Sequence, residues 1–167
     1  MSNGNKEREK NRDSKITAKK GILERLNDAL QNLGGYSKRQ FLYETDLSIA
    51  HYETILRTEP KDKDAWMNLG RLYDKKFMFE KAIESKLKAS NICPYDSEIK
   101  FSIGCSFCGK GDFSAAIKSY MEALELRPDF AEACEAIGEQ YQIIGKAEKA
   151  EEWFFKAQEI RFKQAKS

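Results

Sequence analysis

Residues 66–73 read WMNLGRLY, and this stretch decides the fold of the chain. An apolar residue precedes a glycine, and an aromatic residue follows three positions after it. At helical spacing Trp66, Leu69, Gly70 and Tyr73 share one face. Because glycine inside a helix costs about 1 kcal/mol relative to alanine, its presence here indicates a packing requirement.

The same pattern returns twice, each time after 34 residues. Gly70 is followed by Gly104 and Gly138, each after Leu or Ile and three positions before Phe or Tyr. Alanine recurs at 82, 116 and 150 and again at 89, 123 and 157, and proline recurs at 60, 94 and 128. Such a period is typical of repeats that stack side by side, because one unit cannot bury its apolar face alone.

Each residue type has a physical role in a helix pair. Glycine in the first helix and alanine in the second allow the two antiparallel helices to approach closely. Proline ends the second helix, because the residue before proline avoids helical geometry. A residue able to cap the next first helix stands after each proline. The candidate caps are Asp62 or Asp64, Asp96 or Ser97, and Asp129.

This spacing resembles the tetratricopeptide repeat family, on the motif Trp66-x2-Leu69-Gly70-x2-Tyr73 followed by Ala82, Ala89 and Pro94. The resemblance implies an all-α fold, a right-handed superhelical α-solenoid of antiparallel helix pairs. Three repeats are expected, at 63–96, 97–130 and 131–164. The departures from the motif are Lys100 and Cys134 in place of tryptophan, and Lys86 where Tyr120 and Phe154 supply an aromatic ring.

The two ends differ from the repeats. Residues 1–20 hold seven Lys/Arg and three Asp/Glu, which predicts a flexible basic tail over 1–15. Residues 16–60 predict a divergent helical hairpin that caps the solenoid. Its first helix ends at Gly34-Gly35, and a capping box from Ser37 to Gln40 opens the second. The first helix carries the apolar stripe Ile22, Leu23, Leu26, Leu30 and Leu33.

The C-terminal end shows a different kind of cap. Ile49, Ile83 and Ile117 are expected to face the following repeat, and their counterpart in the last repeat is Glu151. Gln158 likewise replaces an apolar residue. These polar replacements predict that nothing stacks beyond the last helix.

Composition excludes several classes of protein. A net charge of +2 is too small to indicate a nucleic-acid binder. No stretch reaches the roughly 18 apolar residues that a membrane span needs, and the polar start does not read as a secretory signal. We therefore expect a cytoplasmic protein that binds neither nucleic acid nor membrane.

The sequence contains few residues that could carry out catalysis or bind a metal. His51 is the only histidine, and no acid or nucleophile is placed beside it by a recognisable motif. Cys105-x-x-Cys108 lies inside a predicted helix without the second ligand pair that a zinc site needs. Packing or groove lining is favoured for these thiols, and a metal or redox site is the less favoured alternative. We expect no enzymatic activity, no cofactor and no metal.

The family resemblance implies that the first helices line a concave groove that binds a partner protein or peptide. The groove is basic and polar at one end, apolar in the middle and acidic at the other. Glu135 and Glu139 would repel a terminal carboxylate, so capture of chaperone C-termini is not expected. The expected groove residues are Met67, Asn68, Arg71, Asp74, Lys75, Phe101, Ser102, Cys105, Cys108, Glu135, Glu139 and Gln142.

A second functional hypothesis concerns the aromatic residues near the C-terminal end. Trp153, Phe155 and Phe162 are large and close to the last helix surface. They either pack within the last hairpin or form an exposed patch for self-association. The alternative function is therefore that of a structural or oligomeric subunit.

Overall fold

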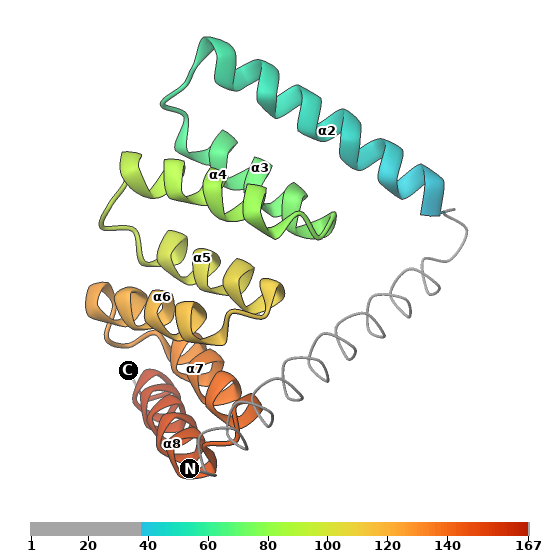
Figure 1. Ribbon diagram of the computed structural model, residues 1–167. Coiled ribbons are helices and arrows are strands. Elements are labelled where there is room, and N and C mark those ends of the chain that lie inside the picture. Colours follow the sequence, from blue (N-terminus) through green and yellow to red (C-terminus); the bar gives the residue numbers. More distant parts are fainter. Residues whose placement is uncertain (1–37, 167) are drawn as a thin grey trace, which may run out of the picture.

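The computed structural model describes residues 38–166, and every regular element in that range is a helix (Figure 1). The predictions for the tail over 1–15, for the first helix of the hairpin and for Ser37 lie outside the described residues. The helices are α2 (Lys38–Thr58), α3 (Lys63–Lys75), α4 (Phe79–Ile92), α5 (Ser97–Lys110), α6 (Phe113–Leu126), α7 (Ala131–Ile143) and α8 (Ala147–Gln164).

The helices are arranged as a stack of pairs. The closest neighbours are α3 with α4, α5 with α6, and α7 with α8, and each pair is joined by a short turn. Contacts of α4 with α5 and of α6 with α7 join successive pairs, while α2 packs on α3. Figure 1 shows the stack running from α2 to α8 in chain order. The predicted all-α solenoid of antiparallel helix pairs is therefore confirmed.

The recurring glycines lie where the two helices of a pair meet. A Cβ atom at Gly70 would stand 2.7 Å from Cγ of Lys86. The corresponding distance at Gly104 is 2.5 Å to Cε1 of Tyr120, and at Gly138 it is 2.7 Å to Cε1 of Phe154. These values are below ordinary contact distances, so a larger residue would force the helices apart. The inferred packing role of the three glycines is confirmed.

The period also appears in the backbone of the turns. Within the described chain, positive φ angles occur at Phe77 (59°), Gly111 (82°) and Gly145 (78°). These positions are 34 residues apart, and each lies in the turn between the two helices of a pair. Glycine adopts this left-handed conformation readily, whereas phenylalanine does so at a cost.

Two of the three predicted helix caps are confirmed. The Asp62 side chain accepts a hydrogen bond from the Ala65 N–H at 2.9 Å, and Asp96 accepts one from the Glu98 N–H at 3.0 Å. The expectation for Asp129 is wrong, because Phe130 occupies the N-cap position of α7 without a side-chain cap. Phe130 is buried against Phe101, with ring centroids 4.9 Å apart. Burial of this ring therefore decides where α7 begins.

The isoleucines expected to face the following repeat are buried in the core. Ile49 packs with Leu69 and Tyr73 of α3, and Ile117 packs with Ile137 of α7. Their polar counterpart Glu151 is exposed on α8, as is Gln158. The end of the described chain therefore presents a polar surface at these two positions.

Candidate interaction surfaces

The polar residues of α3 divide between the surface and the core. Arg71 and Lys75 are exposed and Asn68 is half-buried, so these three side chains can reach a partner. Met67 lies among Ala89 and the isoleucines of α5 and is only 7% exposed. It therefore belongs to the contact between the first two helix pairs and has no access to a groove.

Asp74 serves a structural network rather than an open surface. The buried Lys86 ammonium donates to Asp74 Oδ2 at 2.5 Å, to the Ser102 carbonyl at 2.9 Å and to Ser106 Oγ at 2.7 Å. Ser106 Oγ in turn donates to Asp74 Oδ2 at 3.0 Å. This network joins α3, α4 and α5 where the other pairs place an aromatic ring, which explains how a lysine is tolerated there.

The candidate residues of α5 present a narrow surface. Cys105 is exposed and Ser102 is half-buried. Phe101 packs between the rings of Tyr120 and Phe130, with centroid distances of 5.2 and 4.9 Å. Its side chain therefore contributes mainly to the contact between the second and third helix pairs.

The candidate residues of α7 carry the acidic end of this surface. Glu139 and Gln142 are exposed. Glu135 is half-buried and accepts from the Arg161 guanidinium of α8 at 2.8 Å, so its charge is partly compensated. We call the exposed positions Arg71, Lys75, Cys105, Glu139 and Gln142, together with Asn68 and Ser102, the first-helix face.

Three of the four thiols are weaker acids than a free cysteine. Desolvation is the main effect that raises the pKa of the Cys105, Cys108 and Cys134 thiols above their usual value. The Tyr120 hydroxyl donates to the Cys105 sulfur at 3.6 Å. Within residues 38–166, no group of three or more His, Cys, Asp or Glu side chains could hold a metal ion.

The aromatic residues of α8 do not form one patch. Trp153 is half-buried against the core around Ile117 and Ile137, with the Lys156 ammonium 4.1 Å from its ring centroid. Phe155 and Phe162 are 62% and 61% exposed. They are two helical turns apart and therefore share a face of α8. Of the three aromatic residues predicted to form a patch, only these two phenylalanines remain as candidates for self-association.

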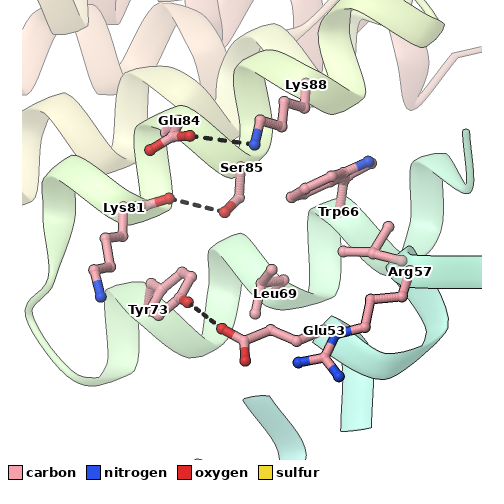
Figure 2. Close-up of a pocket in the computed structure, with 10 residues that line it drawn as sticks. Glu53, Arg57, Trp66, Leu69, Tyr73, Lys81, Glu84, Ser85 and Lys88 are labelled. Carbon is pink, nitrogen blue, oxygen red and sulfur yellow. Dashed lines mark hydrogen bonds and ion pairs between the residues drawn. The ribbon is translucent and has the colours of Figure 1, made fainter. Parts of the chain in front are cut away.

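A pocket that the sequence did not indicate lies over α3, between α2 and α4 (Figure 2). Its apolar lining consists of Leu56, Trp66, Leu69 and the ring of Tyr73. The Tyr73 hydroxyl donates to Glu53 Oε1 at 2.9 Å. Burial, followed by this hydrogen bond, raises the pKa of Tyr73 to about 12. Trp66 was recognisable as a motif residue, but only the packing of α2 reveals a pocket beside it.

None of the helices in the described part of the chain is both long and apolar enough to cross a membrane.

Comparison with known proteins supports the repeat assignment. A family model described as Tetratricopeptide repeat matches residues 63–96 and 97–130. These ranges contain the pairs α3–α4 and α5–α6. Residues 131–164 are outside the match, so the third repeat remains a prediction, although α7 and α8 form a pair with the same glycine contact.

Among curated proteins, the chain is similar to Superkiller complex protein 3 of Mus musculus, with 28% identity over 99 residues. It is also similar to Tetratricopeptide repeat protein 37 of Xenopus laevis, with 25% identity over 100 residues. These matches include 59% and 60% of this chain, but only 6% of either relative. The chain thus spans a small fraction of the curated proteins that it matches.

Solved structures of MamA share the fold. One of them, MamA AMB-1, is 28% identical, has a TM-score of 0.60, and aligns over 69% of this chain and 68% of its own. A second, MamA 41-end from Desulfovibrio magneticus RS-1, is 16% identical with a TM-score of 0.68, and aligns over 93% and 97%. Because the family model matches two consecutive helix pairs in the register of the glycine contacts, residues 63–130 are two tetratricopeptide repeats.

Proposed function

We propose that this protein is an interaction scaffold that binds an extended peptide or short helix of a partner protein along the first-helix face. Tetratricopeptide repeats support a scaffold role in general. The name Superkiller complex protein 3 describes a component of an assembly, and a scaffold role is consistent with that likeness. The proposal assigns no reaction to the chain.

The observation that carries the proposal is the charge distribution along this face. Arg71 and Lys75 of α3 are exposed and make no ion pair within the described residues, and Glu139 of α7 is likewise exposed without one. Cys105 and Ser102 of α5 lie between these ends in the chain order of the stack. A partner with an acidic end, a small or apolar middle and a basic end would complement this arrangement.

Charge reversal tests the proposal without disturbing the core. The variant R71E/K75E/E139K changes three exposed residues, so its unfolding transition is expected to match that of the unmodified chain. The matched control is K118E/K146E/E125K, which makes the same number and signs of charge reversal at exposed positions outside this face. Partners captured from native cell extract by the unmodified chain should be lost with the first variant and kept with the control. Identical capture by all three proteins would contradict the proposal.

Self-association through α8 is a second candidate function. The observation in its favour is the exposure of Phe155 and Phe162 on one face of the last described helix. Sedimentation velocity over a range of concentrations tests it, with F155S/F162S as the variant. A concentration-dependent assembly that the variant abolishes would support the idea, and a strict monomer at all concentrations would exclude it.

A further inference from the structure

The pocket over α3 has charged side chains around its rim and apolar side chains at its base. It occupies about 360 Å³ between α2 and α4. Figure 2 shows Trp66, Leu69 and Tyr73 projecting from α3 between the charged side chains of the two flanking helices. The charged lining consists of Glu53 and Arg57 from α2, and Lys81, Glu84 and Lys88 from α4. Both the pocket and the first-helix face include residues of α3, but no single residue belongs to both.

Both carboxylates of the lining already have partners inside the pocket. Glu53 accepts from the Tyr73 hydroxyl at 2.9 Å. Glu84 pairs with the Lys88 ammonium at 3.2 Å, and that ammonium also lies 4.4 Å from the Trp66 ring centroid. Trp66 is itself held in place, because its indole N–H donates to the Pro60 carbonyl at 2.9 Å. Glu53 therefore has a hydrogen-bond partner, Glu84 has an ion-pair partner, and Trp66 at the base of the pocket is fixed by its own hydrogen bond.

The basic side of the lining is not matched in the same way. Lys81 contacts the Tyr73 ring at 5.5 Å but forms no ion pair in the described part of the chain. Arg57 forms no ion pair there either. Both residues are exposed at the rim of the pocket. Three cations and two carboxylates give the lining a net charge of +1, and Arg57 and Lys81 stand around the half-buried Trp66 without an ion pair among the described residues.

The corresponding position in the next repeat is occupied differently. Thirty-four residues after Trp66 and Lys88 stand Lys100 and Glu122, which pair with each other at 3.2 Å. The polar groups there satisfy one another across α5 and α6. An aromatic floor with unmatched cations is therefore a property of these particular residues and does not follow from repeat geometry alone.

We propose that this pocket is a second protein-binding site, which accepts an acidic peptide segment of a partner. One aromatic or branched aliphatic side chain of the segment packs on Trp66, and carboxylates beside it pair with Arg57 and Lys81. Tryptophan, tyrosine and arginine are the residues that most often carry binding energy at interfaces. A volume near 360 Å³ is at the small end of ligand pockets, which suits a single anchoring side chain.

The charge of the pocket argues against residues 1–20 of the same chain as the occupant. Residues 1–20 hold seven Lys/Arg and three Asp/Glu, so this segment has the same sign as Arg57 and Lys81. Like charges brought together at an interface are unfavourable. A segment of another protein with several acidic residues has the complementary sign.

Three labelled synthetic peptides test the proposal with the full chain: an acidic peptide with one central Phe, the same peptide with Ser in place of Phe, and a basic peptide with Phe. Fluorescence anisotropy should show binding of the first, which weakens as salt is raised. The second should bind at least about tenfold more weakly, because it lacks the anchoring ring. Absence of binding by the acidic Phe peptide, or equal binding of the basic one, would overturn the proposal.

Substitutions locate the bound peptide. R57E/K81E should weaken binding of the acidic Phe peptide at least about tenfold, since it reverses both free charges. The control K118E/K146E makes the same change of net charge at exposed positions outside the pocket and should bind normally. R71E/K75E/E139K should also bind normally, so failure of the first-helix-face proposal remains distinguishable. Loss of binding in R71E/K75E/E139K together with retention in R57E/K81E would overturn the pocket assignment.

A direct readout uses the two tryptophans of the chain. In an amide correlation spectrum, the acidic Phe peptide should shift the indole resonance of Trp66 and leave that of Trp153 unchanged. A shift confined to Trp153 would contradict the proposal. Sedimentation without peptide checks whether a second copy of the chain already occupies the pocket. A dimer that R57E/K81E dissociates would overturn the proposal, because the occupant would then be a second copy of the chain and not an acidic segment of another protein.

Discussion

Phe77 adopts a backbone conformation that the repeat otherwise assigns to glycine. Its φ is 59°, whereas the equivalent turns have Gly111 and Gly145. A left-handed backbone costs about 1–2 kcal/mol for a residue with a Cβ. Phe77 is 44% exposed and has an edge contact with Phe79 as partial compensation.

We therefore expect F77G to be more stable than F77A by about 1 kcal/mol. Both variants lose the ring contact with Phe79, so the difference between them isolates the strain on the backbone. Urea titration followed by circular dichroism gives the two free energies of unfolding. Equal stability of F77G and F77A would show that position 77 is unstrained.

Lys86 is the residue whose environment departs furthest from the repeat. Its side chain is 2% exposed and its ammonium lies among Asp74, Ser102 and Ser106. Removing one member of a buried ion pair leaves the other without compensation. K86M should therefore lower the free energy of unfolding by about 3 kcal/mol.

The double variant D74A/K86M provides the control for this prediction. It removes both charges at once, so much of the lost stability should return. Chemical denaturation of the two single variants and the double variant forms a double-mutant cycle. A purely additive cycle would show that the contact between Lys86 and Asp74 contributes nothing to stability.

At the scale of single residues, the sequence indicated why a residue type is needed better than it indicated which side chains surround that residue. The glycine at 70 could be assigned to a helix contact because its cost needs a reason, and that contact exists. Met67 could not be separated from Arg71 by helical position alone, since only the placement of α5 buries it. The partners of Lys86 come from two other helices, 12 and 20 residues away, and no local pattern indicates them.

At the scale of the helix pair, the glycine contact sets the distance between helices. A Cβ at position 104 would lie 2.5 Å from the Tyr120 ring. Alanine gains about 1 kcal/mol of helix propensity over glycine, but overpacking costs about 1–3 kcal/mol. The clash involves the Tyr120 ring, which is only 2% exposed and has little room to move. We therefore expect overpacking to dominate, so that G104A lowers the free energy of unfolding by about 1–2 kcal/mol.

Substitution at Gly145 separates this steric effect from backbone strain. A Cβ there would meet nothing within 4 Å, but φ is +78°. G145A should lower the free energy of unfolding by about 1 kcal/mol through backbone strain alone. Shortening a neighbouring side chain in the G145A variant should not restore this stability. In contrast, G104A combined with Y120L should recover part of its loss, because the ring is the obstacle. Thermal unfolding measures all four variants, and a G104A protein as stable as the original would contradict the contact.

Helix boundaries show where sequence reasoning holds at this scale. The prolines at 60, 94 and 128 follow the ends of α2, α4 and α6 as predicted. Asp62 and Asp96 cap their helices, whereas the N-cap position of α7 falls to Phe130, whose ring is drawn into the core. Local capping preference therefore decided the boundary only where no large apolar side chain competed for the same turn.

At the scale of the whole molecule, the two proposed sites share helix α3 but use different residues of it and different neighbouring helices. The first-helix face is built from α3, α5 and α7, and the pocket needs α2 and α4 to flank α3. The residues of the first surface were proposed from a period of 34 residues, because each expected repeat contributes to it. The pocket could not be found in this way, because the position of α2 on α3 is a tertiary contact.

The stacked arrangement of helix pairs also predicts how far a local destabilisation extends along the molecule. Each pair contacts mainly its neighbours, so stability is approximately a sum of pair and interface contributions. G138A places a Cβ 2.7 Å from the Phe154 ring in the last pair, and G104A makes an equivalent clash in the middle pair. We expect G138A to raise amide hydrogen exchange in α7 and α8 while α3 and α4 keep their protection.

G104A should raise amide hydrogen exchange in α5 and α6 and also in their neighbours α4 and α7, because both neighbours pack against the destabilised pair. Mass spectrometry of proteolytic peptides resolves these segments. An equal rise of exchange along α3–α8 in both variants would show instead that the described helices open as a single unit.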